Sequence, residues 1–135
     1  MTDHSLLKTT ILLLVSDPLV RSVMAETLEN AGYMVLSAGD LGQAIDLLKH
    51  SAPDLLITRS YVQGLPGHDA AIYLRSKCTK MRVLMVGGHL DDDRLRHRIE
   101  LQKFEVFPKP YTAAELLQKV KDVLHRPRGS TIPPM

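Results

Sequence analysis

Two basic residues, Arg59 and Lys109, stand where buried strands are expected to end. Arg59 comes two residues after the apolar run 55–57, and Lys109 lies just beyond a later run. The carboxyl ends of parallel strands meet at one edge of a sheet, so two cations there could bind a phosphate, a nucleotide or a partner carboxylate. Gly87 and Gly88 follow another apolar run and would let such an anion approach the backbone closely.

A structural role for Arg59 is the alternative, and it is the one we favour. Its side chain can pair with Asp17, which follows the first apolar run, or extend to solvent. Charge clusters of this kind are often structural networks. On this interpretation the guanidinium fills space and binds no ligand.

Other residues that could support catalysis or metal binding lack the necessary spacing. The six histidines are scattered, and none has a paired zinc spacing with Cys or His. The three aspartates at 91–93 favour a helix N-terminus over a metal cluster. The glycines form neither a dinucleotide fingerprint nor a P-loop, and there is no nucleophile elbow. We therefore expect no enzyme, no metal site and no cofactor.

Composition and charge describe an ordinary globular domain. The 135 residues suit one domain, with 44% apolar and 24% charged residues. A net charge of +2 and the absence of Trp give little basis for direct nucleic-acid binding. The single cysteine, Cys78, is consistent with a reducing cytoplasm. The apolar region 6–15 contains Lys8 and is too short to span a membrane, so we expect neither a signal peptide nor a transmembrane helix.

Strand-type apolar runs alternate with stretches of helical periodicity five times. The alternation predicts an α/β fold in which a five-stranded, doubly wound parallel sheet is covered by helices on both faces. We expect a domain over residues 10–125, an N-terminal extension at 1–9 and a flexible tail at 126–135. The expected strands are 11–15, 33–36, 55–58, 83–86 and 104–107.

Several helix boundaries carry capping signals. Asp17 followed by Pro18 predicts the start of the first helix, and Gly32 its end. Thr112 and Glu115 form a capping box for the last helix. The second helix has a similar pair in Asp40 and Gln43, the third surrounds 70–74, and the fourth, after the aspartates, is the weakest. The predicted apolar face of the first helix consists of Val20, Val23, Met24, Leu28 and Ala31.

From Thr10 to about Leu124 the chain resembles the receiver domain of bacterial response regulators, a flavodoxin-like (βα)5 fold. The resemblance implies the strand order 2-1-3-4-5. It rests on four stretches, in the family's order and spacing: ILLLVSDPLVR at 11–21, PDLLITRSYVQGLPG at 53–67, VLMVGGH at 83–89 and FPKPY at 107–111.

The resemblance also implies where a phosphoryl-transfer site would lie, and this chain departs from it. The family's phosphoacceptor Asp falls on Arg59, and its metal-binding acidic pair falls on Val15 and Ser16. The phosphate-binding hydroxyl falls on Gly87, whereas the lysine is kept as Lys109. A shift of one residue could supply Asp17 as a single acidic ligand, and the aromatic switch position falls on Val106. With two cations converging, Mg²⁺ is not expected to bind.

These substitutions predict a degenerate receiver that acts by binding a protein, such as a histidine kinase or another response regulator, without phosphotransfer. We expect it to be cytoplasmic and to stand alone without an effector domain. An anion-sensing module with a ligand at Arg59 and Lys109 is the alternative, and a conventional phosphoacceptor is a third hypothesis. The fourth helix, fifth strand and fifth helix are the family's usual dimer and partner face. Its charged residues here are Arg94, Arg96, His97, Arg98, Glu100, Lys103, Glu105, Glu115 and Lys119.

Overall fold

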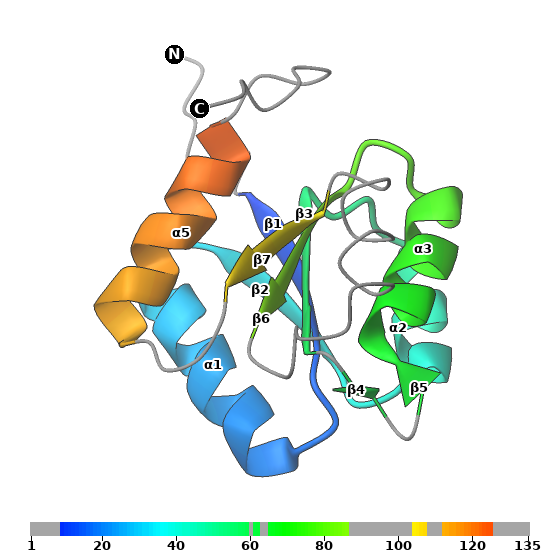
Figure 1. Cartoon of the computed structure of the whole chain (residues 1–135), viewed down its shortest axis with the longest axis horizontal. Coiled ribbons are helices and arrows are strands. Elements are labelled where there is room, and N and C mark those ends of the chain that lie inside the picture. The colour runs from blue at the N-terminus through cyan, green and yellow to red at the C-terminus, as the bar shows by residue number, and fades with distance from the viewer. Residues whose placement is uncertain (1–8, 60, 63–64, 87–103, 108–111, 126–135) are drawn as a thin grey trace.

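The computed structural model describes residues 9–59, 61–62, 65–86, 104–107 and 112–125. A five-stranded sheet runs through its centre in the order β2-β1-β3-β6-β7, and every neighbouring pair is parallel (Figure 1). Counted within this sheet alone, the order is 2-1-3-4-5, which confirms the predicted topology. The strands are β1 (Thr10–Leu14), β2 (Met34–Ala38), β3 (Leu55–Arg59), β6 (Arg82–Val86) and β7 (Glu105–Phe107).

Helices cover both faces of this sheet, as the alternating pattern predicts. In Figure 1, α1 and α5 lie on one side of the strands and α2 and α3 on the other. Their bounds are α1 (Pro18–Asn30), α2 (Leu41–Leu48), α3 (Gly67–Lys77) and α5 (Ala113–His125). The expected fourth helix and the two terminal segments lie outside the described residues. No helix of the described part is long and apolar enough to cross a membrane.

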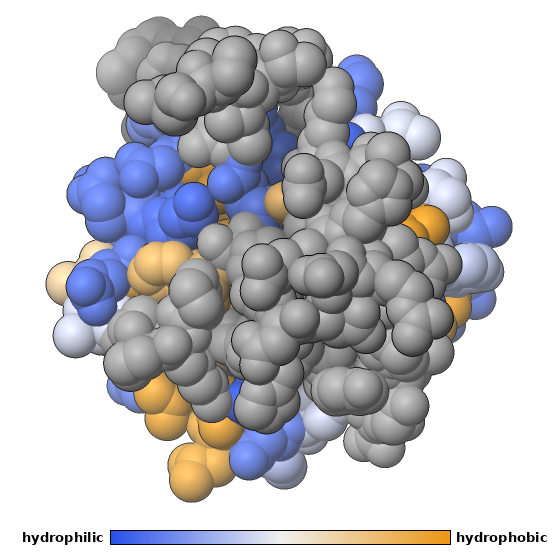
Figure 2. All heavy atoms as spheres, viewed as in Figure 1, coloured by the Kyte–Doolittle hydropathy of each residue, from blue (hydrophilic) through white to orange (hydrophobic). Residues whose placement is uncertain are grey.

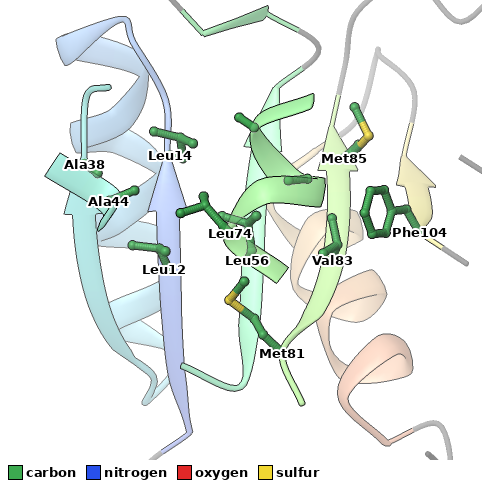
Figure 3. Close-up of a cluster of buried hydrophobic side chains, with 12 residues drawn as sticks. Leu12, Leu14, Ala38, Ala44, Leu56, Leu74, Met81, Val83, Met85 and Phe104 are labelled. Carbon is green, nitrogen blue, oxygen red and sulfur yellow. The ribbon is translucent and has the colours of Figure 1, made fainter. Parts of the chain in front are cut away.

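Strand residues alternate between the two apolar layers, since successive side chains of a strand point to opposite faces. Leu12, Leu14 and Leu56 pack on the α2 and α3 side (Figure 3). Ile11 and Ile57 pack on the other side, beneath α1 and α5. Both faces of the central strands are therefore buried.

The predicted caps of α1 and α5 are present. Asp17 accepts hydrogen bonds from the amides of Leu19 and Val20, at 2.9 and 3.3 Å. Gly32 ends α1 with a φ of 101°, a backbone conformation that glycine adopts without steric strain. At α5, Thr112 and Glu115 each accept a hydrogen bond from the other's amide, at 3.1 and 2.8 Å. Local sequence alone fixes these helix ends.

Three local predictions differ from the structure. Val23 and Ala31 do not belong to the buried face of α1: Val23 is 55% exposed and Ala31 is an exposed C-cap, because the apolar layer beneath α1 is reached by Met24 and Leu28. Gln43 accepts from the amide of Gly39 at 2.6 Å and not from that of Asp40. A hairpin of β4 (Tyr61–Val62) and β5 (Leu65–Pro66) precedes α3 and was not predicted.

Candidate functional site

The predicted site lies where β1 and β3 end side by side. Leu14, the last residue of β1, is in register with Thr58 of β3. Arg59 follows Thr58 as the last residue of β3, and it is in register with Val86 at the end of β6. Parallel pairing therefore brings three carboxyl strand ends to one edge, and Arg59 is the charged residue that β3 contributes there.

Arg59 is partly buried and lacks a counter-ion in the described part of the chain. Its carbonyl oxygen accepts a hydrogen bond of 3.3 Å from the hydroxyl of Thr58, whose side chain is fully buried. The ion pairs found among the described residues join Lys49 to Asp46 and Lys119 to Glu105, so neither contains Arg59. The guanidinium is thus a partly buried positive charge at the sheet edge.

Asp17 does not neutralise this charge, contrary to the predicted ion pair. Its Oδ1 atom accepts from two backbone amides at the start of α1. Such a cap provides hydrogen bonds for amides that no helical carbonyl can reach. The negative charge of the carboxylate is also stabilised by the positive end of the helix dipole. The physical reason for the missing pair is therefore that helix capping holds Asp17 at the start of α1.

The two positions before Asp17 provide no carboxylate either. Val15 is fully buried in the apolar layer that contains Met24 and Leu28. Ser16 is partly exposed. Their carbonyl oxygens both accept hydrogen bonds from Nη1 of Arg21, at 2.7 and 3.3 Å. The two residues that follow β1 therefore supply no carboxylate, and their carbonyl oxygens are bonded to a cation.

Arg21 was missed by the sequence analysis. The sequence feature that could have pointed to Arg21 is its place in the first turn of a helix, where the positive end of the helix dipole disfavours a cation. Such a residue often has a specific reason for its position. Here the reason is the pair of carbonyl oxygens at the end of β1.

These residues do not suit Mg²⁺, which needs several oxygen ligands in octahedral geometry, usually with at least one carboxylate. Val15 has no oxygen in its side chain, Asp17 is engaged as a cap, and Arg59 adds positive charge. Within the described ranges, no group of three or more His, Cys, Asp or Glu side chains could hold a metal ion.

Of the other predicted site residues, the structure describes Val106 but not the two glycines or the lysine. Gly87, Gly88 and Lys109 lie outside the described residues, so the expected meeting of Lys109 with Arg59 stays a prediction. Val106 belongs to β7, where it is in register with Met85 of β6. Because β7 is an edge strand of the sheet, the position of Val106 agrees with the expected fifth strand.

Comparison with known proteins identifies the family. Residues 11–121 match the family model of the response regulator receiver domain. The chain belongs to that family. Its relatives include the phosphate regulon transcriptional regulatory protein PhoB of Pseudomonas aeruginosa, 29% identical over 119 residues, covering 87% of this chain and 52% of that protein. The transcriptional regulatory protein CpxR of Escherichia coli is 31% identical over 120 residues, covering 89% and 51%. The chain therefore spans about half the length of these two regulators.

A shorter relative and the solved structures agree with this assignment. Sporulation initiation phosphotransferase F of Bacillus subtilis is 25% identical over 105 residues, covering 78% of this chain and 85% of that protein. A CheY-like receiver domain protein from Methanospirillum hungatei has a TM-score of 0.79 at 19% identity, covering 87% of this chain and 94% of that one. A response regulator from Thermotoga maritima has a TM-score of 0.76 at 18% identity, covering 88% and 99%. The structural similarity confirms the receiver fold.

Two polar contacts fix the last helix of this receiver domain to its sheet. Lys119 of α5 pairs with Glu105 of β7 at 3.2 Å, and their side chains are only 23% and 14% exposed. Arg82 of β6 donates to the carbonyl of Val123 near the end of α5. Together with the capping box at Glu115, these contacts occupy all the charged groups of the predicted partner face that the structure describes.

Proposed function

We propose that this receiver domain works in two-component signalling without accepting a phosphoryl group. The observation that carries the proposal is Arg59 at the end of β3, where the receiver family has its acceptor carboxylate. A guanidinium has no nucleophilic oxygen, and a carboxylate is the group that forms an acyl phosphate. The buried Val15 and the capping role of Asp17 support the same proposal, since neither supplies a metal ligand.

In this proposal the domain acts by binding a protein in the cytoplasm, either a histidine kinase or another response regulator. Receiver domains interact with both kinds of protein. Direct nucleic-acid binding is not part of the proposal, because a net charge of +2 gives little attraction for phosphate backbones.

The first turns of α1 offer a contact surface for such a partner. Leu19 is 73% exposed and Val23, one helical turn later, is 55% exposed. In Figure 2, apolar side chains appear at the lower left edge, near the beginning of α1 in Figure 1. Exposed acidic side chains accompany this pair, namely Asp17 at the N-cap of α1 and Glu26 and Glu29 within the helix. The combination fits an apolar helix with basic flanks.

The predicted face of fourth helix, fifth strand and fifth helix has less support. In its described part, Glu105 and Lys119 pair with each other and Glu115 caps α5. Charges that are already paired gain little from a partner, because new contacts would replace existing ones. A homodimer through this face stays a prediction, since the fourth helix lies outside the described residues.

The proposal is tested by incubating the protein with acetyl phosphate and Mg²⁺ and measuring its intact mass. We expect no stable gain of a phosphoryl group, while a receiver with an aspartate at the end of its third strand gains one. The variant Arg59→Asp should also stay unmodified, because Val15 and Ser16 supply no carboxylates for the metal. A stable phosphoryl gain by the wild-type protein, mapped to this sheet edge, would overturn the proposal.

Anion sensing is a second candidate function, because Arg59 lacks a carboxylate partner among the described residues. A partly buried guanidinium attracts phosphate or carboxylate oxygens and can bind them through two parallel hydrogen bonds. Titration with inorganic phosphate should then shift NMR signals at the end of β3, and Arg59→Glu should abolish the shifts. Shifts that persist in this variant would place the anion elsewhere.

A further inference from the structure

Arg21 makes an unusual contact for a residue in the first turn of a helix. Its Nη1 atom donates to the carbonyl oxygens of Val15 and Ser16 at the end of β1. The positive end of the helix dipole disfavours a cation at this position. Hydrogen bonds between a charged donor and partly buried carbonyls are among the stronger ones, and they offset that cost.

Gly39, just beyond β2, provides the space for the guanidinium. A Cβ atom at this position would lie 2.7 Å from Nη1 of Arg21 and 3.4 Å from its Cζ. The amide of Gly39 donates to Gln43, and the amide of Val15 donates to the carbonyl of Ala38 at 3.0 Å. Arg21 therefore contacts the ends of both β1 and β2, at the point where their hydrogen-bonded ladder stops.

We propose that Arg21, seated against Gly39, is a built-in cation that holds the segment between β1 and α1 in one conformation without an ion from solution. Backbone carbonyl oxygens are ligands that Ca²⁺ and similar hard cations use. Here the two carbonyls of residues 15 and 16 are already occupied by a guanidinium of the same chain. We call this contact the Arg21 strap.

The strap also bears on the proposed contact surface, and this step rests on the proposed function. Leu19 and Arg21 belong to the same first turn of α1. Fixing one side of that turn to the strand ends limits the conformations that Leu19 can sample. A surface that is ordered before binding loses less entropy when a partner docks.

Amide hydrogen exchange measures the strap directly, because the amides of Val15 and Gly39 are both hydrogen-bonded beside it. In Arg21→Gln, exchange at these two amides should accelerate roughly tenfold or more, as expected for loss of a charged hydrogen bond. The central strand amides of Leu13 and Ile57 should keep their relative protection. A uniform acceleration at all four amides would contradict the proposed role of the Arg21 strap, because it would indicate only a general loss of stability.

The variant Gly39→Ala tests the strap while keeping Arg21. The backbone at Gly39 is not in the left-handed region, so alanine fits it. The new methyl group would displace the guanidinium, which is the flexible end of a long side chain, and should accelerate exchange at Val15 as Arg21→Gln does. Gly42→Ala is the matched control, since its Cβ would meet only Asp40 Oδ1, at 3.4 Å. Wild-type exchange in Gly39→Ala, or equal acceleration in Gly42→Ala, would refute the proposal.

Magnesium provides the last test of the strap. Exchange at Val15 and Gly39 in the wild-type protein should be the same in EDTA and in millimolar Mg²⁺. Slower exchange in Mg²⁺ would show that an ion from solution orders this segment, and would overturn the strap. These outcomes are independent of the acetyl phosphate experiment, which decides the proposed function by a change in mass.

Discussion

The carboxylate of Asp17 bonds to the amides of Leu19 and Val20 and forms no ion pair with Arg59, although the structure describes both residues. Asp17 therefore stabilises α1, and Arg59 keeps its charge at the end of β3. The receiver domain therefore has a guanidinium, and no Asp17–Arg59 ion pair, where β3 ends.

The role of Asp17 is testable with two substitutions. Asp17→Ala should lower the free energy of unfolding by about 1 kcal/mol, because the cap is lost. Asp17→Asn should lower it by less than about 0.5 kcal/mol, since asparagine caps nearly as well. Urea denaturation measures both. Equal losses in the two variants would instead indicate that the charge of Asp17, and not its capping hydrogen bonds, is what stabilises the fold.

The surface of α1 should matter for binding and not for folding. Leu19→Ser should leave the free energy of unfolding within about 0.5 kcal/mol of wild type, because Leu19 is mostly exposed. In a complex with a histidine kinase or response regulator, the same change should weaken binding roughly tenfold, or about 1.4 kcal/mol. Met34→Ser is the matched control, since Met34 is 50% exposed but belongs to β2. Equal effects of the two variants on calorimetric affinity would exclude α1 as the contact surface.

The ion pair between Glu105 and Lys119 should contribute more to stability than the pair on α2. Its side chains are shielded from solvent, whereas those of Lys49 and Asp46 are 64% and 75% exposed. A double-mutant cycle should give a coupling of about 1–2 kcal/mol for the shielded pair and below about 0.5 kcal/mol for the exposed one. Couplings of similar size would mean that α5 is not anchored by this contact.

Tyr33 predicts a pH dependence of stability at alkaline pH. Partial burial, which removes water from the phenol, raises its pKa above the usual 10.0. The protonated phenol therefore contributes its full share to the stability of the folded state below pH 10. This contribution is lost as the pH rises through the folded pKa, because the unfolded chain releases the proton first. Urea unfolding at pH 8 and pH 11 should show a smaller loss for Tyr33→Phe than for wild type. Identical losses would contradict a phenol that partial burial keeps neutral.

Local signals predicted much of the fold. Asp17, Gly32 and the Thr112–Glu115 pair set helix ends through bonds within a few residues, and such bonds can be read from sequence. The exposure of Val23 could not be predicted from sequence, because helical periodicity does not say how far the neighbouring apolar layer extends along a helix. The hairpin β4–β5 has only two residues in each strand, too few for an alternating pattern.

The candidate site was harder to predict than the fold. The sequence identified Arg59 as a cation at a strand end, and the pairing of β3 with β6 confirms that position. It could not decide whether Asp17 caps a helix or pairs with Arg59, since both uses suit a carboxylate. The role of Arg21 could not be predicted for a different reason. Its guanidinium lies beside Gly39 only because β1 and β2 are paired, and the sequence does not show that pairing directly.

The most direct test of the central claim is an amide NMR titration of the ¹⁵N-labelled protein with Mg²⁺ and beryllofluoride, an analogue of the phosphoryl group. The proposal that the domain accepts no phosphoryl group predicts that signals from Leu14 at the end of β1 and Arg59 at the end of β3 do not change when both reagents are added together. Saturable shifts of these two residues that require Mg²⁺ and beryllofluoride jointly would show a working phosphoacceptor site and would contradict the claim.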